Sequence, residues 1–303
     1  MNKVTVIMST FNGEKYVEEQ IKSIFLQNDV LVSLFIRDDG STDGTINIIK
    51  KLQKKYPIKF VIGGKNLKPA YSFLEALKIC DFQTDYYSYA DQDDVWFPDK
   101  LKRACQKLKN YSASIPSLYC SSYDVVDENL NLIFTRDLGV YGDLTLQTTL
   151  VGVTPSGCTM VFNKSLMDIL KDSNPRYMRM HDFWTLLTAQ AYDGNVVIDN
   201  IPTMSYRQHG NNTVGFSNRF ELRHWIRLIK NVRNHNERYR QAISVMENYE
   251  TSMSDINLRK LKKLLEYPTS FSNKIKLLKD NSFKTTITRI NFLFRISVLL
   301  GIY

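Results

Sequence analysis

Cysteine is scarce in this sequence of 303 residues, and the four cysteines that occur are widely dispersed. No Cys-x-x-Cys spacing links Cys80, Cys105, Cys120 and Cys158, so neither a zinc site nor a disulfide framework is indicated. Unpaired cysteines of this kind fit a reducing compartment.

Long apolar segments, internal repeats and low-complexity tracts are also missing. The final apolar run, residues 292–300, is interrupted by Arg295 and is too short and too charged to span a bilayer. Because Met1, Asn2 and Lys3 lead directly into the first apolar run, there is no room for a signal peptide. We therefore expect the protein to remain in the cytoplasm.

Short β-branched runs alternate with amphipathic stretches through the first hundred residues. This alternation predicts an α/β fold, with a mainly parallel sheet flanked by helices. The pattern becomes less regular after Asp94, where the sequence predicts further strands and a helix that opens at 180–184. The predicted strands are residues 4–8, 31–37, 58–62, 86–90, 117–122, 129–134 and 195–198, with another entered from a turn within 152–162.

Three carboxylates occur within four positions, at Asp91, Asp93 and Asp94, directly after the predicted strand 86–90. Their mutual repulsion is costly unless a cation offsets it. Hard oxygen ligands suit Mg²⁺ or Mn²⁺, which bind through one or two carboxylates together with substrate phosphates. A solvated acidic turn that caps the following helix is the simpler alternative.

Two more polar loops, residues 9–13 and 38–45, also follow predicted strands and should lie along the same edge of the sheet. Together, the Ser-x-x-Asn turn, the Asp-Asp-Gly-Ser-x-Asp-x-Thr loop and the Asp-x-Asp loop resemble the glycosyltransferase family 2 pattern. The resemblance covers about the first hundred residues. It implies the GT-A fold, a Rossmann-like sheet that binds a sugar nucleotide.

The same resemblance assigns residues to the sugar nucleotide. Ser9, Phe11 and Asp39 would surround the base and ribose, with Asp39 accepting a hydrogen bond from the pyrimidine N–H. Asp91 would lie near the donor ribose or sugar, and Asp93 would coordinate the metal on the diphosphate. Glu14 could bond the ribose, although the helix dipole alone also favours a carboxylate at a helix start.

Asp182 is the candidate general base, because the family carries a carboxylate at this kind of helix start. Glycosyl transfer needs such a group, since an acceptor hydroxyl is a poor nucleophile until its proton is taken. The alternative is that Asp182 only caps its helix. The family more often has Glu-Asp here, so His181 is a departure without an inherited role.

Residues 206–215 form a polar, glycine-bounded motif that resembles a rhamnosyltransferase-like branch of family 2. In that branch Asp-Gln-Asp-Asp-Val-Trp and Tyr-Arg-Gln-His-Gly-Asn-Asn occur together. His209 would be a further metal ligand, and Arg207 would contact the diphosphate with paired N–H groups. A hydrogen-bonded surface histidine is the alternative for His209.

The net charge of +9 arises from 40 Lys and Arg against 31 Asp and Glu, and much of the excess lies beyond residue 218. We expect a GT-A domain at residues 1–217 and a basic helical region at 218–303, with a strong helical stretch at 220–249. A basic helix beside an apolar helix is typical of a protein that binds the inner membrane surface. Packing on the core or on a second subunit, as in a homodimer, is the alternative.

The resulting hypothesis is an inverting, metal-dependent hexosyltransferase. It would move L-rhamnose from dTDP-rhamnose to a lipid-linked oligosaccharide in capsule or cell-wall polysaccharide synthesis. Nucleotidyl transfer ranks low, because residues 9–13 lack Lys and Arg. Nucleic-acid binding is not expected, since no motif for it appears. An inactive GT-A-like scaffold or nucleotide-binding protein at the membrane is disfavoured by the joint presence of Asp39, Asp93 and Asp182.

Overall fold

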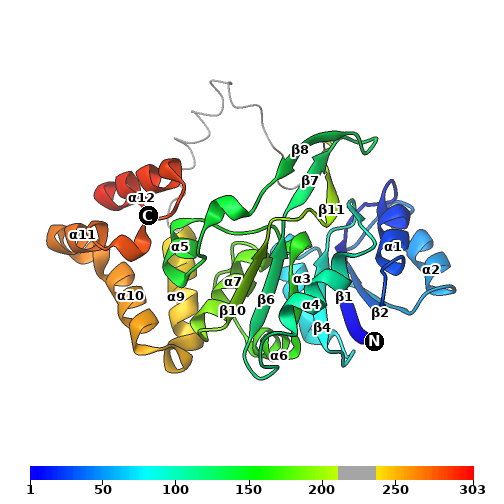
Figure 1. Cartoon of the computed structure of the whole chain (residues 1–303), viewed down its shortest axis with the longest axis horizontal. Helices are drawn as coiled ribbons and strands as arrows, with labels where there is room; N and C mark the ends of the chain where they lie inside the picture. Colours follow the sequence, from blue (N-terminus) through cyan, green and yellow to red (C-terminus); the bar gives the residue numbers. More distant parts are fainter. Residues whose placement is uncertain (211–236) are drawn as a thin grey trace.

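A computed structural model describes residues 1–210 and 237–303, and its central element is a seven-stranded sheet (Figure 1). The strand order is β10-β6-β9-β4-β1-β2-β3. Only β9 among these strands runs antiparallel to its neighbours. The strands are β1 (Asn2–Thr10), β2 (Val30–Asp38), β3 (Ile58–Ile62), β4 (Tyr86–Ala90), β6 (Ser117–Ser121), β9 (Val161–Asn163) and β10 (Asn195–Asp199).

Helices cover both faces of this sheet. The β1 side chains Val4, Val6 and Ile7 are fully buried, as expected for a central strand of a parallel sheet. Right-handed crossovers place α1 and α2 on one face and α3 on the other, where it packs with α6 and α7. These helices and α4 and α5 are α1 (Val17–Phe25), α2 (Thr45–Gln53), α3 (Lys68–Ile79), α4 (Lys100–Leu108), α5 (Leu146–Val151), α6 (Lys164–Asp172) and α7 (His181–Ala191).

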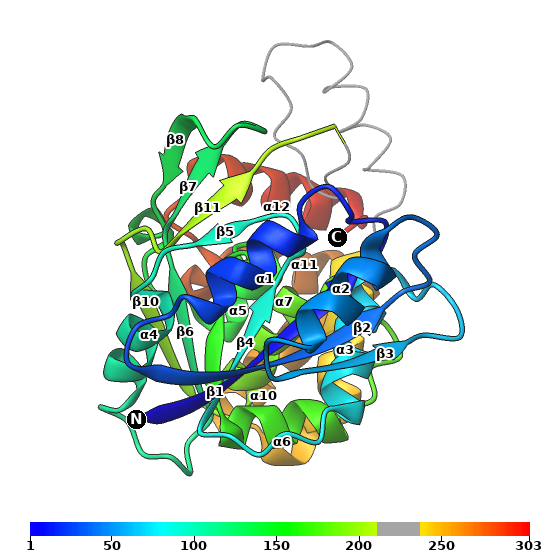
Figure 2. The ribbon, with the colours of Figure 1, turned by 90° about the vertical axis from the view of Figure 1, so that its right-hand side faces the viewer.

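A small second sheet lies at the end of the main sheet where β4 terminates (Figure 2). Its order is β5-β11-β7-β8, and β5 follows β4 through the acidic loop 91–94. Short 3₁₀ turns, η1 (Gly139–Tyr141) and η2 (Gly157–Thr159), lie in the connection from this sheet to β9. Its strands are β5 (Val95–Trp96), β7 (Tyr123–Val126), β8 (Leu132–Arg136) and β11 (Met204–Arg207).

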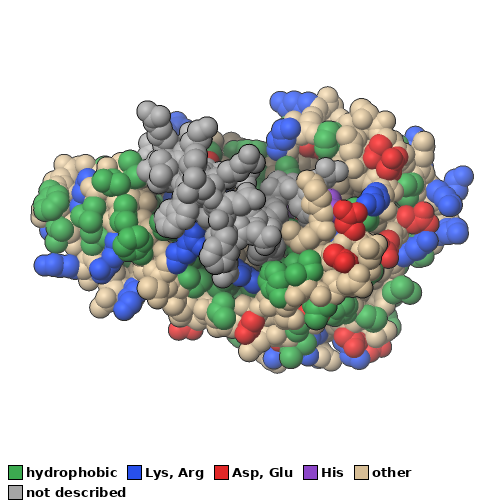
Figure 3. All heavy atoms as spheres, turned by 90° about the horizontal axis from the view of Figure 1, so that it is seen from above, with side chains coloured by type: hydrophobic (Ala, Val, Ile, Leu, Met, Phe, Trp, Pro, Cys, Tyr) green, Lys and Arg blue, Asp and Glu red, His purple; other side chains and the backbone are tan. Residues whose placement is uncertain are grey.

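The C-terminal region is helical. Helix α9 (Glu237–Tyr249) packs on α5 and α7, and Ala242, Val245 and Tyr249 join the same hydrophobic core as the sheet. Seen from above, hydrophobic side chains with Lys and Arg among them gather at the end of the molecule formed by these helices (Figure 3). The elements are α9 (Glu237–Tyr249), η3 (Glu250–Ser252), α10 (Asp255–Glu266), η4 (Tyr267–Thr269), α11 (Phe271–Leu278), η5 (Asn281–Phe283) and α12 (Thr288–Leu300).

The predicted α/β class and mainly parallel sheet are confirmed, and the strands predicted at 58–62 and 86–90 have the observed bounds. The strand predicted at 129–134 is shifted, because β8 begins at Leu132. Strand β7 was not predicted, because it follows β6 after Ser122 without a glycine or proline to mark a turn. The predicted domain boundary near Ser217 and the first part of the helix predicted at 220–249 lie outside the described residues.

Candidate active site

The three polar loops predicted to share one edge of the sheet do so. Strands β1, β2 and β4 are neighbours in parallel register and end at Thr10, Asp38 and Ala90, so residues 9–13, 38–45 and 91–94 emerge together. They border a cleft of about 1020 Å³. The predicted site residues that line this cleft are Ser9, Phe11, Asp39, Asp91, Asp93, Asp182 and His209.

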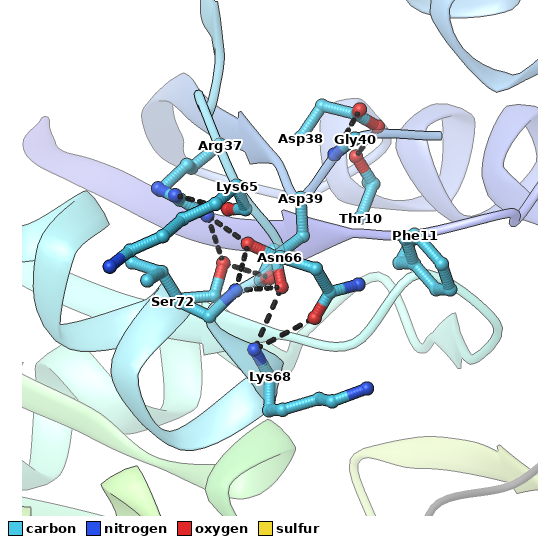
Figure 4. A network of polar contacts seen from close by, with 12 residues as sticks. Thr10, Phe11, Arg37, Asp38, Asp39, Gly40, Lys65, Asn66, Lys68 and Ser72 are labelled. Carbon is cyan, nitrogen blue, oxygen red and sulfur yellow. Dashed lines mark hydrogen bonds and ion pairs between the residues drawn. The ribbon is translucent and has the colours of Figure 1, made fainter. Parts of the chain in front are cut away.

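Asp38 shapes the second loop and does not line the cleft. Its carboxylate accepts hydrogen bonds from Thr10 Oγ1 at 2.8 Å and from the Gly40 and Ser41 backbone N–H groups at 3.0 and 2.7 Å (Figure 4). Gly40 has φ +92°, a conformation in which a residue with a side chain is strained. This turn directs the next carboxylate, that of Asp39, into the cleft.

Asp39 is buried and is held by several donors (Figure 4). The Arg37 guanidinium pairs with it, and the backbone N–H groups of Leu67 and Lys68 donate to it at 2.9 Å. Arg37 also donates to Ser72 Oγ at 2.9 Å, which in turn accepts from Ser9 Oγ at 2.7 Å. A carboxylate offers roughly four acceptor positions, so a ligand N–H that reaches Asp39 must share or displace these partners.

Phe11 is exposed at the cleft and is tied to the acidic loop through its backbone. The Gln92 side-chain amide accepts from Phe11 N–H at 2.9 Å and donates to Phe11 C=O at 3.0 Å. The ring of Phe11 is 45% exposed, so its face is available for stacking. Gln92 therefore fixes the distance between the first loop and the carboxylates.

Glu14 and Arg207, both predicted to contact the nucleotide, do not line the cleft. The Glu14 carboxylate accepts from Gly44 N–H at 2.6 Å, which joins the first two loops. The Arg207 guanidinium donates to the backbone carbonyls of Asp93 at 2.9 Å and Glu128 at 2.6 Å. These contacts support the loops from behind, and the predicted ribose and diphosphate contacts stay predictions.

His209 and Asp93, the two predicted metal ligands, lie in direct contact. His209 Nε2 is 2.8 Å from Asp93 Oδ2, and both side chains are mostly buried. The Tyr16 ring packs against the His209 imidazole, with 4.9 Å between the ring centroids. The Arg207 guanidinium lies over the Tyr16 ring, 4.6 Å from its centroid. Residues more than a hundred positions apart thus form one preorganised pair.

Asp91, Asp94 and Cys158 form a second cluster whose ligand atoms all lie within 4.8 Å of one another. Burial and the charges of Asp93 and Asp182 raise the pKa of Asp91 to about 7, and burial also raises the pKa of Asp94 well above its ordinary value. Asp94 Oδ2 is buried without a hydrogen-bond partner. Such a carboxylate group fits a divalent cation, which would reverse these pKa shifts.

The neighbourhood of Asp94 also contains a buried lysine that sequence reasoning did not single out. Lys100 Nζ donates to the Cys158 carbonyl at 2.9 Å and lies 4.7 Å from the Trp96 ring centroid. Burial lowers the pKa of Lys100 to about 8, whereas the Asp94 charge raises it. Lys100 therefore brings a positively charged group near Asp94 in the protein interior.

Asp182 opens α7 and faces the cleft. Its carboxylate accepts from the backbone N–H of Gly157 at 3.2 Å and of Phe183 at 2.6 Å. Burial nevertheless raises the pKa of Asp182 to about 6. A general base with a pKa near the working pH combines the ionised form with a usable proton affinity.

His181 is a packed aromatic residue directly before Asp182. Its ring stacks on Phe73 with centroids 3.9 Å apart and meets Tyr89 edge-on at 4.8 Å. Neither ring nitrogen has a hydrogen-bond partner, and burial lowers the pKa of His181 to about 3, so the imidazole is neutral. A Cβ at Gly157 would lie 2.4 Å from His181 Nε2, so glycine permits the close approach. This packing sets where α7 begins and where Asp182 stands.

Comparison with known proteins agrees with this geometry. The sequence profile of glycosyl transferase family 2 matches residues 5–170. The chain is 34% identical over 238 residues to the dTDP-rhamnosyl transferase RfbG of Shigella flexneri, covering 72% of this chain and 76% of that protein. The chain belongs to glycosyl transferase family 2.

Solved structures show that this glycosyltransferase has the GT-A fold. It matches the S. aureus TarS 1-349 complex with UDP-GlcNAc with a TM-score of 0.56 at 18% identity, over 99% of this chain and 89% of that one. It also matches the mannosyltransferase PcManGT from Pyrobaculum calidifontis in complex with GDP-Man and Mn²⁺, with a TM-score of 0.50 at 14% identity, over 100% of this chain and 81% of that one.

The raised pKa of Asp182 predicts a pH-dependent stability difference in this glycosyltransferase. Because the folded-state pKa of about 6 exceeds the ordinary 3.8, folding favours the protonated carboxyl, and that contribution is lost as pH rises through 6. Asp182→Asn should therefore stabilise the fold at pH 8 by up to about 3 kcal/mol. The gain should vanish near pH 4. Urea unfolding across this range measures it, and the exposed Asp143→Asn variant is the control; a constant difference would contradict the assignment.

Proposed function

We propose that this family 2 enzyme transfers a hexose, L-rhamnose from dTDP-L-rhamnose, with inversion at the anomeric centre, onto a lipid-linked oligosaccharide in capsule or cell-wall polysaccharide synthesis. The observation that carries the proposal is one cleft lined by Asp39, Asp93, His209 and Asp182 together. A relative with 34% identity carries the name dTDP-rhamnosyl transferase, which supports the choice of donor.

The cleft is large enough for a nucleotide sugar, since its volume of about 1020 Å³ lies at the upper end of the usual range for ligand sites. Phe11 would cover one face of the thymine ring, and Asp39 would accept its ring N–H. Ser9 is linked to Asp39 through the Ser72 hydroxyl and the Arg37 guanidinium. Ser9, Phe11 and Asp39 would hold the nucleoside. Asp91, at the next strand end, would face the ribose or the sugar.

Asp182 would take the proton of the attacking acceptor hydroxyl. Its two backbone donors hold the carboxylate in place without removing its charge, and burial keeps its proton affinity high. Asp93 and His209 would hold Mg²⁺ or Mn²⁺, which when bound neutralises the departing nucleoside diphosphate. A single displacement inverts the anomeric centre, as in inverting glycosidases, where a carboxylate acts as general base on the attacking nucleophile.

A donor panel tests the proposal directly. The purified protein is incubated with dTDP-rhamnose, UDP-GlcNAc, UDP-glucose and GDP-mannose plus Mg²⁺ or Mn²⁺, while released nucleoside diphosphate is measured with and without acceptor-lipid extract. We expect the largest release with dTDP-rhamnose. Asp182→Asn should reduce turnover roughly 10²- to 10⁴-fold, as expected for loss of a general base, with donor binding nearly unchanged. Loss of donor binding with normal turnover at saturation would contradict the role of Asp182.

Metal dependence is tested at the Asp93–His209 pair. Asp93→Asn should remove most transfer, because the amide is a poorer ligand and leaves the diphosphate charge less neutralised. EDTA should have the same effect on the wild-type enzyme, reversed by added Mn²⁺. The surface variant Asp81→Asn, whose partner Lys59 is also exposed, is the control. Full activity in EDTA would exclude a metal-dependent mechanism.

The C-terminal helices would bring the enzyme to an anionic membrane surface. Helix α12 buries Phe294 and Val298, while its outer face exposes apolar side chains spaced to form one stripe. Exposed basic residues Lys276, Lys284 and Arg295 lie in the same region. The exposed apolar side chains of α12 are Phe292, Leu293, Ile296, Leu299 and Leu300.

The lysines of α10 form ion pairs within the protein. Lys260 and Lys263 both pair with the buried carboxylate of Asp280, at 2.8 and 2.6 Å, and Lys262 pairs with Glu250 at 3.1 Å. Lys260 and Lys263 therefore join α10 to the loop after α11, Lys262 joins it to η3, and all three are less available to lipid. Among the described helices, none is long and apolar enough to cross a bilayer.

Liposome flotation tests this surface. Replacing Phe292, Ile296 and Leu299 together with Ser should release the protein from phosphatidylglycerol vesicles. Lys276→Gln with Lys284→Gln should weaken binding in a salt-sensitive way, by about 1 kcal/mol per charge. Serine at the exposed β8 residues Leu132 and Ile133 is the matched control. Equal flotation of all variants would contradict the proposal, and a shift from dimer to monomer in the α12 variant would identify the stripe as a subunit interface.

A further inference from the structure

Some of the basic side chains that line the cleft form ion pairs with carboxylates, and others do not. Lys15 pairs with Glu128 at 2.6 Å, and Arg179 lies 3.8 Å from Glu237. Arg136 and Arg238 also line the cleft, but no carboxylate among residues 1–210 and 237–303 pairs with either. A partly buried guanidinium without a counter-charge loses hydration energy that a bound anion would restore.

Both guanidinium groups are anchored to the same connection, residues 139–152. Arg136 Nη2 donates to Tyr141 Oη at 3.1 Å and Arg238 Nη1 donates to the Val151 carbonyl at the end of α5. Each contact uses one terminal nitrogen of a group that carries five N–H donors. The remaining donors can bind oxyanion oxygens in pairs.

Gly152 shows that the position of Arg238 is built into the fold. A Cβ at Gly152 would lie 2.4 Å from Arg238 Nη2, and the backbone there has φ +127°, which disfavours other residues. Glycine therefore leaves the space that the guanidinium occupies. The adjoining residues Thr154, Pro155 and Ser156 also line the cleft and lead to Gly157, whose N–H donates to Asp182.

We propose that Arg136 and Arg238 form a subsite for a phosphate or diphosphate group of the acceptor. Arg136 on β8 and Arg238 on α9 line the same cleft as Asp182, whereas Phe11 and Asp39 lie in the loops that follow β1 and β2. The inference rests on the proposed function, in which the acceptor is a lipid-linked saccharide whose diphosphate adjoins the sugar. Binding that group would place an acceptor hydroxyl near Asp182.

Calorimetric titration of the full chain tests the subsite. With dTDP and Mg²⁺ saturating the donor side, the protein is titrated with inorganic pyrophosphate, farnesyl diphosphate, farnesol and glucuronate. We expect both diphosphates to bind and farnesol and glucuronate not to bind. Tighter binding of farnesyl diphosphate than of pyrophosphate would indicate a lipid-linked source, and equal affinity a free phosphate compound. Binding of farnesol or glucuronate as tight as that of the diphosphates would overturn the proposal.

Variants identify the two arginines as the cause. Arg136→Gln and Arg238→Gln should each raise the Kd for farnesyl diphosphate roughly tenfold, as expected for loss of charge-assisted hydrogen bonds. Arg240→Gln is the matched control, because Arg240 lies on the same helix but is over the Tyr177 ring, 4.4 Å from its centroid. Arg238→Lys, which keeps the charge, should recover part of the affinity. Unchanged Kd values in both Gln variants would overturn the subsite.

Failure of the proposed function gives a different result. The dTDP affinity and the thermal unfolding temperature are measured for every variant; the dTDP affinity should match that of the wild type, and each variant should remain folded at the temperature of the titration. If dTDP fails to bind while diphosphate binding still depends on Arg136 and Arg238, the donor assignment fails and the subsite stands. If dTDP binds and neither diphosphate does, the subsite fails and the donor assignment stands.

Discussion

Repulsion between carboxylates at one edge of a parallel sheet is the constraint around which this glycosyltransferase is built. Asp39, Asp91, Asp93 and Asp182 all line a single cleft, and Asp94 is buried beside it. Each like charge at short range raises the free energy of the folded state unless a cation or a set of N–H donors offsets it. The contacts around these acids therefore decide which of them can stay ionised.

The groups that surround the carboxylates differ from one aspartate to the next. Asp39 pairs with the Arg37 guanidinium and accepts hydrogen bonds from two backbone N–H groups. Burial and the charges of Asp93 and Asp182 raise the pKa of Asp91 to about 7, although a hydrogen bond with the Cys158 side chain lowers it in part. A cation at the neighbouring Asp93 would supply the missing charge. Metal and substrate binding would thus be coupled to the ionisation of Asp91.

Much of the nucleotide half could be predicted from the sequence, because its signals are local. A short apolar run followed by a polar loop specifies a strand end within about ten residues, and this holds for Asp39 after β2 and for Asp93 after β4. The pairing of Asp93 with His209 was reached only through the resemblance. The local pattern does not specify it, since 116 positions separate the two residues and the contact depends on β11 joining the small sheet.

For other features the local sequence does not specify the placement in the fold. Strand β9 has three residues and inserts antiparallel between β4 and β6, a placement decided by the edges available in the sheet. Cys158 looked like one of four dispersed cysteines, and only the fold brings it to Asp91 and Asp94. The role of His181 could not be predicted from the sequence, because it depends on the packing of its ring against Phe73 and Tyr89.

The cleft also explains why the C-terminal helices belong to the enzyme. Helix α9 packs on α5 and α7, and α7 begins with His181 and Asp182, the residue that we propose as the base. Arg238 in its first turn reaches the end of α5, while Tyr303 at the far end of the chain donates to the Leu150 carbonyl of the same helix. Both ends of the C-terminal region therefore fix α5. The C-terminal helices that we propose to meet the membrane are therefore joined by direct contacts to α5 and α7, next to the cleft residues Gly152 and Asp182.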